Sequence, residues 1–494
     1  MTEKQGDPRH LETLDRDLAR FSNLESATSL VARPTVGLGI SFIFVVLAGL
    51  AAMLLFDQSN NLLIVVVAAC LGAYMALNIG ANDVANNMGP AVGANALSMG
   101  GAIAIAVVFE SAGALIAGGD VVSTIAKGII APESMGTASV FIWAMMAALL
   151  SAALWVNLAT WLGAPVSTTH SVVGGVMGAG IAAAGFAAVN WPTMGTIAAS
   201  WVISPMLGGA IAALFLALIK SRIIYREDKI AAARVWVPIL VGIMAGAFAS
   251  YLALKGLKKI IKIDLPTALL IGAVIGGLIW VAMIPVIRKQ SVGLENRNKS
   301  LKTLFSIPLV VSAALLSFAH GANDVANAVG PLAAIVHASQ SGDFLEAASI
   351  PIWVMVIGAF GISFGLFLFG PKLIRMVGGQ ITKLNPMRAY CVALSAAITV
   401  IVASWLGLPV SSTHIAVGAV FGVGFFREWD AERRIKKARL AMPERASYAP
   451  EERRRRKLVR RSHFMTIIAA WIITVPAAAI LSGTIFFLIN SAMS

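Results

Sequence analysis

The heptapeptide Gly-Ala-Asn-Asp-Val-Ala-Asn occurs twice in this chain, at residues 80–86 and again at residues 321–327. Each copy follows a long apolar run, so Asp83 and Asp324 lie where a chain that crosses a lipid bilayer normally carries no charge. An ionisable side chain at such a position is energetically expensive and by default marks an ion or substrate site. Two copies in corresponding places predict a transporter built from repeats, with its site where the repeats meet.

The composition supports a membrane location. Hydrophobic residues make up 58% of the 494 positions and charged residues only 13%, whereas a soluble protein of this length carries about 25% charge. Residues 427–461 hold fourteen Lys and Arg against six Asp and Glu, and so supply +8 of the net charge of +14. This clustering is typical of a cytoplasmic loop near anionic lipids, so we expect no nucleic-acid partner. Cys70 and Cys391 lie in separate apolar runs, which predicts neither a disulfide nor a metal site.

These features predict an all-α polytopic membrane protein. Eleven apolar stretches are long enough to span a bilayer of ~30 Å; they lie near 36–56, 62–79, 100–118, 138–163, 195–219, 235–254, 266–287, 304–320, 349–370, 389–407 and 464–489. Two further apolar, Gly-rich stretches at 166–186 and 410–426 follow Pro165 and Pro409, as expected of half-helices that begin after a break. We therefore expect about 12–13 transmembrane segments with broken helices at the midplane.

The chain also contains a longer internal repeat. Residues 75–98 align with residues 316–339 at an offset of 241, and residues 160–175 align with residues 404–419 at an offset of 244. The predicted organisation is a cytoplasmic tail with an extra helix (1–61), transport repeat 1 (62–219), a linker with two transmembrane helices (220–303) and transport repeat 2 (304–489). A basic cytoplasmic insert at 427–463 belongs to the second repeat alone.

The distribution of loop charge sets the expected orientation. Loops near 220–234, 288–303, 371–388 and 427–461 are rich in Lys and Arg, whereas those near 57–61, 187–194, 332–348 and 490–494 contain none. Placing the basic loops in the cytoplasm gives thirteen crossings, with the N-terminus inside and the C-terminus outside. The two repeats then have inverted topology. Lys255, Lys258, Lys259 and Lys262 disagree with this arrangement, because they would lie outside.

Hydroxyl residues follow both prolines, and we expect them to bind an oxyanion. Such residues would cap the half-helices and leave backbone N–H groups facing the break, and a helix N-terminus of this kind is a ready anion site. The predicted substrate-binding residues are Ser167, Thr168, Thr169, Ser411, Ser412 and Thr413.

The two heptapeptides carry carboxylates, which would repel an anion unless cations bind with it. Carboxylate and amide oxygens are hard ligands that suit Na⁺, and Asp83, Asn86, Asp324 and Asn327 could hold it; alternatively, the Asp side chains carry protons. Because no Arg or Lys lies in the core of either repeat, the cation would supply the missing positive charge. The candidate cation-binding and coupling residues are Asp83, Asn82, Asn86, Asp324, Asn323, Asn327 and Glu110.

Each motif also has a purely structural interpretation. The Asn-Asp pairs could be helix C-terminal turns, the hydroxyl triads could be ordinary helix starts, and Glu110 could be a buried packing carboxylate. We expect His170 and His414, which follow the triads, to support them by hydrogen bonding. His320 aligns with Ile79 in the other half, which indicates a structural role.

The duplicated GANDVAN followed by the duplicated P-V-S-[ST]-T-H resembles the inorganic phosphate transporter (PiT) family of cation-coupled symporters. The resemblance runs from about residue 62 to residue 489. It implies phosphate uptake driven by Na⁺ or H⁺, inverted repeats and commonly a homodimer. It also implies that Asp83, Asn86, Asp324 and Asn327 occupy signature positions, that the two triads occupy the family's hydroxyl positions, and that Glu110 matches a frequent acidic position.

We expect a multi-pass protein of the bacterial inner membrane that imports inorganic phosphate by symport with Na⁺ or H⁺ through alternating access, without catalytic residues or a cofactor. A sulfate or metal–phosphate symporter of the same fold remains an alternative, as does a passive anion channel, whose natural marker would be a ring of basic pore residues. An intramembrane hydrolase using Ser167, His170 and Asp83 is a further alternative, although a duplicated Ser and His three residues apart fits binding better than nucleophilic catalysis.

Overall fold

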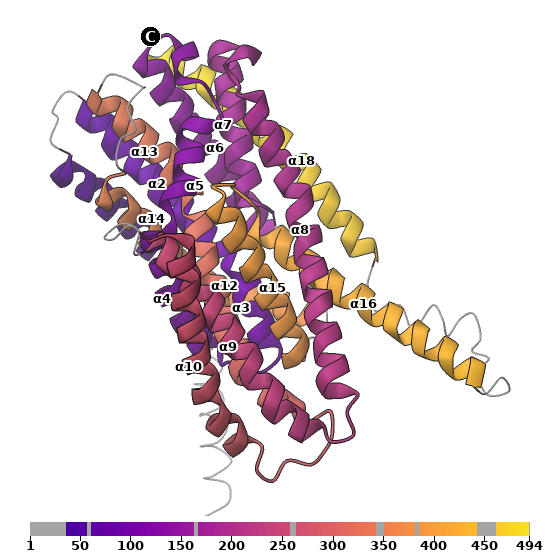
Figure 1. Ribbon diagram of the computed structural model, residues 1–494. Helices are drawn as coiled ribbons and strands as arrows, with labels where there is room; N and C mark the ends of the chain where they lie inside the picture. Colours follow the sequence, from indigo (N-terminus) through magenta and orange to yellow (C-terminus); the bar gives the residue numbers. More distant parts are fainter. Residues whose placement is uncertain are drawn as a thin grey trace, which may run out of the picture.

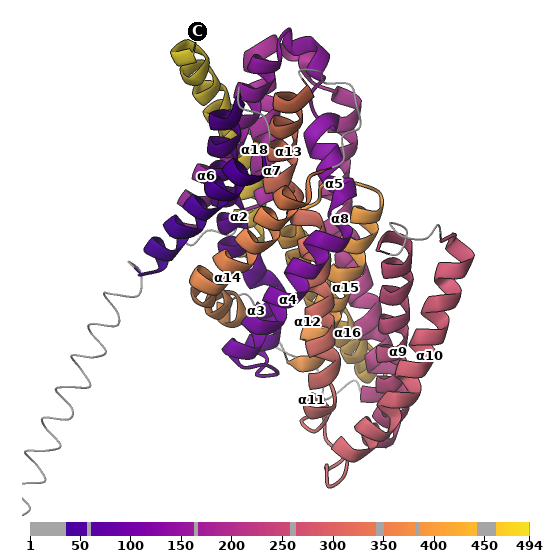
Figure 2. The ribbon, with the colours of Figure 1, turned by 90° about the vertical axis from the view of Figure 1, so that its left-hand side faces the viewer.

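The computed structural model describes residues 36–56, 61–162, 166–256, 263–341, 350–380, 385–441 and 461–493. These residues form helices almost throughout, and the one β-bridge among them joins Ile130 to Val189. The helices lie side by side in a tall bundle, with α9 and α10 standing as a pair at one flank (Figures 1 and 2). Helices satisfy their own backbone hydrogen bonds, which is what a chain crossing lipid requires.

The helices are grouped here by the two copies of the sequence repeat. After a first helix at Val36–Leu55, the first half contains α2 (Leu62–Asn82), α3 (Val84–Gly93), α4 (Met99–Ala117), α5 (Gly119–Ser123), α6 (Ala138–Leu162), α7 (Thr168–Ala184) and α8 (Trp191–Ile219). The pair α9 (Lys229–Lys255) and α10 (Leu265–Gln290) comes next. The second half contains α11 (Leu301–Leu304), α12 (Ser306–Asp324), α13 (Ala326–Ser341), α14 (Ile352–Gln380), α15 (Pro386–Trp405), α16 (Ser412–Ala441) and α18 (Arg461–Met493).

Eleven helices among the described residues are long and apolar enough to cross a membrane, and each overlaps one of the eleven stretches expected from the sequence. The expected total of 12–13 also counted the two proline-led stretches. These stretches form α7, which has only 17 residues, and α16, whose second half is charged. A full crossing needs about 20 apolar residues, so neither helix qualifies by itself.

The two halves pack on each other through equivalent glycines. A Cβ on Gly80 of α2 would lie 1.9 Å from the carbonyl oxygen of Ile362 in α14, and a Cβ on Gly321 of α12 would lie 2.1 Å from that of Glu110 in α4. Only a residue without a side chain permits backbones to approach so closely. Since Gly80 and Gly321 are equivalent in the heptapeptides, Ile362 is the structural counterpart of Glu110.

The same equivalence extends along the α2–α14 pair and the α4–α12 pair. A Cβ on Gly365 would approach the Leu77 carbonyl oxygen, and one on Gly113 would approach that of Phe318, each at 2.0 Å. Residue numbers therefore rise along α2 where they fall along α14, and the same holds for α4 and α12. Between the two pairs, the hydroxyls of Ser111 and Ser363 lie 2.8 Å apart.

One of the lysines that disagreed with the expected orientation has a specific partner. Lys255, at the end of α9, forms an ion pair with Asp120 of α5 and also donates a hydrogen bond to the Trp405 carbonyl oxygen. The pairing neutralises its charge at that end of the molecule. Lys258, Lys259 and Lys262 lie outside the described residues.

Candidate functional site

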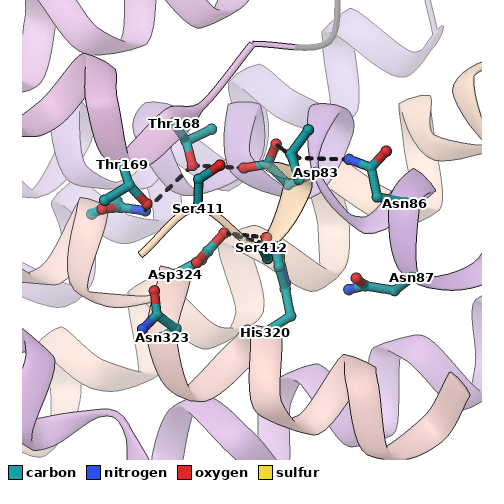
Figure 3. Close-up of polar contacts among 12 residues, drawn as sticks. Asp83, Asn86, Asn87, Thr168, Thr169, His320, Asn323, Asp324, Ser411 and Ser412 are labelled. Carbon is teal, nitrogen blue, oxygen red and sulfur yellow. Dashed lines mark hydrogen bonds and ion pairs between the residues drawn. The ribbon is translucent and has the colours of Figure 1, made fainter. Parts of the chain in front are cut away.

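Two helix junctions and two helix N-termini meet at one place inside the bundle (Figure 3). The α2–α3 junction lies at Asp83 and the α12–α13 junction at Val325, directly after Asp324. The N-termini of α7 and α16 complete the group with the two hydroxyl triads. The site is thus assembled from residues up to 330 positions apart, with one acidic junction and one half-helix from each half.

Both half-helices begin with the N-caps that the sequence predicts. Ser167 Oγ accepts a hydrogen bond from the backbone N–H of His170 at 3.1 Å, and Ser411 Oγ accepts one from that of His414 at 3.3 Å. Such a cap fixes the helix start while the preceding amides of the first turn point toward the break. Because Ser167 Oγ is an acceptor in a helix cap, its geometry does not resemble that of an activated nucleophile.

Asp83 joins the two halves. Its Oδ2 accepts a hydrogen bond from the Thr168 hydroxyl at 2.6 Å, and its Oδ1 accepts one from the Thr413 hydroxyl at 3.1 Å. The carboxylate is only 1% exposed. A hydroxyl from each triad therefore points at one buried negative charge, and hydrogen bonds to charged groups are among the stronger ones in proteins.

Asp324 has a different set of partners. Its Oδ2 accepts a hydrogen bond from the Ser412 hydroxyl at 3.2 Å and lies 2.8 Å from His320 Nε2. The other imidazole nitrogen, Nδ1, lies 2.6 Å from Glu110 Oε2, and Glu110 Oε1 accepts a hydrogen bond from Asn87 at 2.9 Å. His320 therefore bridges two buried carboxylates, which its alignment with Ile79 did not indicate.

The Asn side chains of the heptapeptides divide into two pairs. Asn86 donates to the Thr413 hydroxyl, and Asn327 donates to the hydroxyls of Thr168 and Thr169, so both reach across to the triad of the other half. Asn82 instead donates to Thr160, and Asn323 to the equivalent Ser404. Asn86 and Asn327 therefore contact the triads directly. Asn82 and Asn323 instead connect each junction to the helix that precedes the half-helix of the same half, which is α6 before α7 and α15 before α16.

Several buried oxygens of this site have no hydrogen-bond partner among the described residues. They are Asn82 Oδ1, Asn87 Oδ1, Asn323 Oδ1, Asn327 Oδ1 and Asp324 Oδ1. A buried acceptor without a partner costs about 1–3 kcal/mol, so each one calls for an explanation. Four of the five belong to residues that the sequence predicts as cation ligands, and Asn87 is the exception.

The charge balance of the site is negative. Asp83, Asp324 and Glu110 are all buried, and His320 is the only basic side chain in contact with them in the described part of the chain. One ligand atom each of Asp83, His320 and Asp324 lies within 4.8 Å of the others, a spacing suited to a shared metal ion. Hard cations favour carboxylate and amide oxygens, and a cation here would relieve the excess negative charge.

His170 and His414 lie behind the triads rather than among the carboxylates. Their ring centroids are 4.4 Å apart, and the His170 ring is 3.8 Å from that of Trp201 in α8. Both rings line an apolar cavity between α8, α16 and α18. Their expected hydrogen bonding to the triads stays a prediction.

The sequence alone missed the Ser111–Ser363 contact because the two halves do not align at one constant offset. The heptapeptides align at an offset of 241, but the glycine contacts relate α4 to α14 at an offset of 252, because the connecting segments differ in length. An offset of 241 would place the counterpart of Glu110 at residue 351, whereas the contacts place it at Ile362. The matching spacing of Glu110 to Gly113 and of Ile362 to Gly365 is the signal that could have revealed how α4 aligns with α14.

Comparison with known proteins agrees with the motifs. Residues 79–482 match the model of the phosphate transporter family. A Helicobacter pylori protein named a phosphate permease is 46% identical over 95% of this chain and 98% of its own length. A phosphate permease of Thermococcus kodakarensis is 35% identical over 84% of this chain and 95% of its own length.

A solved structure described as the sodium-dependent phosphate transporter superimposes with a TM-score of 0.77 at 34% sequence identity. It covers 87% of this chain and 99% of its own chain. These relatives are multi-helix membrane permeases rather than enzymes, which confirms the expected class. On the strength of its motifs, its fold and these matches, the chain belongs to the phosphate transporter family.

Proposed function

We propose that this protein imports inorganic phosphate by symport with Na⁺ or H⁺ through alternating access. One observation carries the proposal: the hydroxyl triads and the acidic junctions of both halves converge in a single buried cluster, joined by the hydrogen bonds from Thr168 and Thr413 to Asp83. An arrangement that needs both halves to complete one site is what alternating access around a fixed site requires.

The anion would occupy the space between the two triads. The six hydroxyls of Ser167, Thr168, Thr169, Ser411, Ser412 and Thr413 and the first amides of α7 and α16 are donors suited to phosphate oxygens. In the structure, two of these hydroxyls donate hydrogen bonds to Asp83. A cation that binds the carboxylate would leave those hydroxyls available to the anion, and this exchange would couple the two ligands.

The cation would bind at the acidic junctions. The unpartnered oxygens of Asn82, Asn323, Asn327 and Asp324, together with the carboxylate of Asp83 and the nearby Asn86, provide hard ligands for Na⁺. Protons are the alternative coupling ion, and Glu110 would then join the Asp side chains as a carrier. Among the described residues, neither Lys nor Arg contacts this cluster, so the co-transported cation is the available source of further positive charge.

We also propose that the two halves are repeats of inverted topology, divided as 62–219 and 304–489 around the 220–303 linker. Support for the repeat relation comes from the duplicated contacts of Gly80 and Gly321. The C-terminus lies at one end of the molecule, whereas the basic α8–α9 and α10–α11 connections lie at the other (Figure 1). This agrees with a bacterial inner-membrane protein with an external C-terminus and a cytoplasmic N-terminus, and a homodimer remains our expectation from the family.

Proteoliposome flux tests the proposal. Na⁺ and pH gradients are imposed separately while uptake of labelled phosphate is followed, and the driving gradient identifies the coupling ion. Uptake that ignores both gradients would show a passive anion channel instead. Unlabelled sulfate and preformed divalent metal–phosphate are added as competitors, since stronger competition than that of phosphate itself would favour a symporter of the same fold with that substrate.

A further inference from the structure

A deep apolar groove opens on the outside of the bundle, beside the candidate site rather than within it. It encloses about 1250 Å³ between α8, α16 and α18. His170 and His414 lie at its inner end, and Phe425 and Trp429 of α16 lie at its outer end. Trp429 is 53% exposed and Phe425 is 43% exposed, so the described helices leave aromatic surface uncovered here.

The length of the groove matches one leaflet of a bilayer. His414 and Trp429 are fifteen residues apart on α16, which corresponds to about 22 Å along a helix. The hydrocarbon core of one leaflet is about 15 Å thick, and the headgroup region adds several ångströms. His414 directly follows a triad of the central site, whereas Trp429 is of the residue type that favours the membrane–water interface. α16 runs obliquely to α8 (Figure 1), so the groove spans less than about 22 Å along the membrane normal, which brings its depth close to the thickness of one leaflet.

The outer end of the groove is basic. The Lys220 ammonium lies 5.2 Å from the centroid of the Phe426 ring, and the Arg433 guanidinium lies 5.3 Å from that of Trp429. Arg433 and Lys436 follow Trp429 at four and seven residues, so they continue the helix face that lines the groove. Acidic neighbours are Glu428, Asp430 and Glu432, and Asp430 is already paired with Lys220.

The basic end has no equivalent in the other half. The counterpart of α16 is α7, which ends at Ala184, and Gly185 follows it with a φ of 79°. By contrast, α16 continues to Ala441, and its C-terminal part projects away from the bundle (Figure 1). A projecting basic helix with aromatic side chains is suited to the surface of an anionic membrane.

We propose that this groove binds one anionic phospholipid of the adjacent leaflet. One acyl chain lies against α8 and α18 and ends near His170 and His414, and the phosphate headgroup lies at Arg433 and Lys436. The apolar walls match the chain, the groove length matches one leaflet, and the basic end matches the headgroup. The lipid thus reaches the rear of the hydroxyl triads, although its binding does not depend on the transport mechanism proposed above.

Native mass spectrometry of the full-length protein from mixed phosphatidylglycerol and phosphatidylcholine nanodiscs tests the proposal. Wild-type protein should retain one phosphatidylglycerol in preference to phosphatidylcholine. The exposed double substitution Arg433→Gln/Lys436→Gln should weaken that preference roughly 30-fold, because each basic residue near an anionic surface contributes about fivefold. The matched control Arg288→Gln/Lys289→Gln, at the end of α10, should retain wild-type preference.

A steric pair tests the position of the acyl chain. Ala210 lines the groove from α8 and is exposed, so Ala210→Trp should expel the lipid. Ile203→Trp places the same side chain on an exposed position of α8 that does not line the groove, and it should leave lipid retention unchanged. Equal retention of both lipids by wild type, or of lipid by Ala210→Trp and Ile203→Trp, would overturn the proposal. So would cysteine crosslinking through Met206→Cys that shows a second copy of the chain covering this face.

Discussion

Asp83 and Asp324 occupy equivalent positions in two identical heptapeptides, yet their surroundings differ. Asp83 accepts hydroxyl hydrogen bonds from both halves, through Thr168 and Thr413. Asp324 accepts one from Ser412 and lies against His320, which in turn contacts Glu110. The positions equivalent to His320 and Glu110 hold Ile79 and Ile362. A duplicated frame therefore carries two chemically distinct acidic positions.

This difference bears on coupling. At Asp324 the imidazole is a fixed partner within hydrogen-bonding distance, so part of the role of a cation is already filled by the protein. At Asp83 the partners are neutral hydroxyls, which can rotate and release the carboxylate. We therefore expect Asp83 to depend more on a transported cation than Asp324 does.

Substitution of each carboxylate should give the largest effect. Asp83→Asn removes the charge that holds the cation while preserving size, and we expect phosphate uptake to fall roughly 1,000-fold, since breaking a buried charge pair costs about 3–5 kcal/mol. Asp324→Asn should reduce uptake strongly but by less, because His320 remains. Initial rates in proteoliposomes with equal protein content measure both.

The relative loss of uptake in Asp83→Asn and Asp324→Asn tests whether Asp83 depends more on a transported cation. If Asp324→Asn impaired uptake more than Asp83→Asn, the fixed imidazole would not substitute for a cation. Full uptake by both variants would remove the cation role from the heptapeptides altogether.

A double-mutant cycle tests the His320–Glu110 pair. His320→Ile and Glu110→Ile each copy the side chain found in the other half. Each alone removes one partner of the remaining group, so Glu110 would keep only Asn87 and His320 would keep only Asp324. We expect each single change to destabilise the protein by about 3 kcal/mol, with the double change costing less than their sum. Thermal unfolding of the purified protein in detergent measures the coupling. Strict additivity would show that the two side chains do not depend on each other.

The sequence predicted the frame of this comparison and missed its asymmetry. Hydrophobic runs and the repeated motifs were sufficient for the eleven long helices and for the N-caps at Ser167 and Ser411, because length, apolarity and capping are local properties. The His320–Glu110 contact joins residues 210 positions apart in unlike contexts. No periodicity reports such a contact, and only the packing of α4 on α12 brings it about.

The number of membrane crossings shows a second limit of prediction from the sequence. The proline-led stretches look alike in the sequence, but α7 has 17 residues and α16 has 30. Apolar composition alone cannot tell a half-helix that stops at the edge of the bundle from one that continues beyond it. The helix contacts and the charge of the second half of α16 make that distinction.

Glycine substitutions test whether the frame itself is duplicated. Gly80→Ala and Gly321→Ala would each place a methyl group against a backbone carbonyl of the facing helix. We expect each to destabilise the protein by about 2 kcal/mol through overpacking, and by similar amounts because the contacts are equivalent. Gly277→Ala is the control, since nothing lies within 4 Å of its Cβ position. Unequal effects in thermal unfolding would show that the two helix contacts are not equivalent.

The smallest effect is expected where the halves diverge most, at the extension of α16. Asp430 pairs with Lys220 of the π-helical turn at the end of α8 and accepts a hydrogen bond from Tyr225. Partial burial opposes ionisation of Asp430, but these hydrogen bonds hold its pKa below the ordinary value of 3.8. A lowered pKa means that the ionised pair stabilises the folded protein above about pH 4, and that this contribution is lost as the pH falls through the lowered pKa.

Asp430→Asn should therefore reduce the free energy of unfolding by about 1 kcal/mol at neutral pH. The difference from wild type should vanish at pH values below the lowered pKa. Glu295→Gln is the matched control, because the Glu295–Arg297 pair is 66% and 73% exposed and should contribute almost nothing. If Asp430→Asn matched this control at neutral pH, the ion pair would not be what holds the extension of α16 to α8. The divergence between α7 and α16 would then be a difference in helix length without a dedicated anchor.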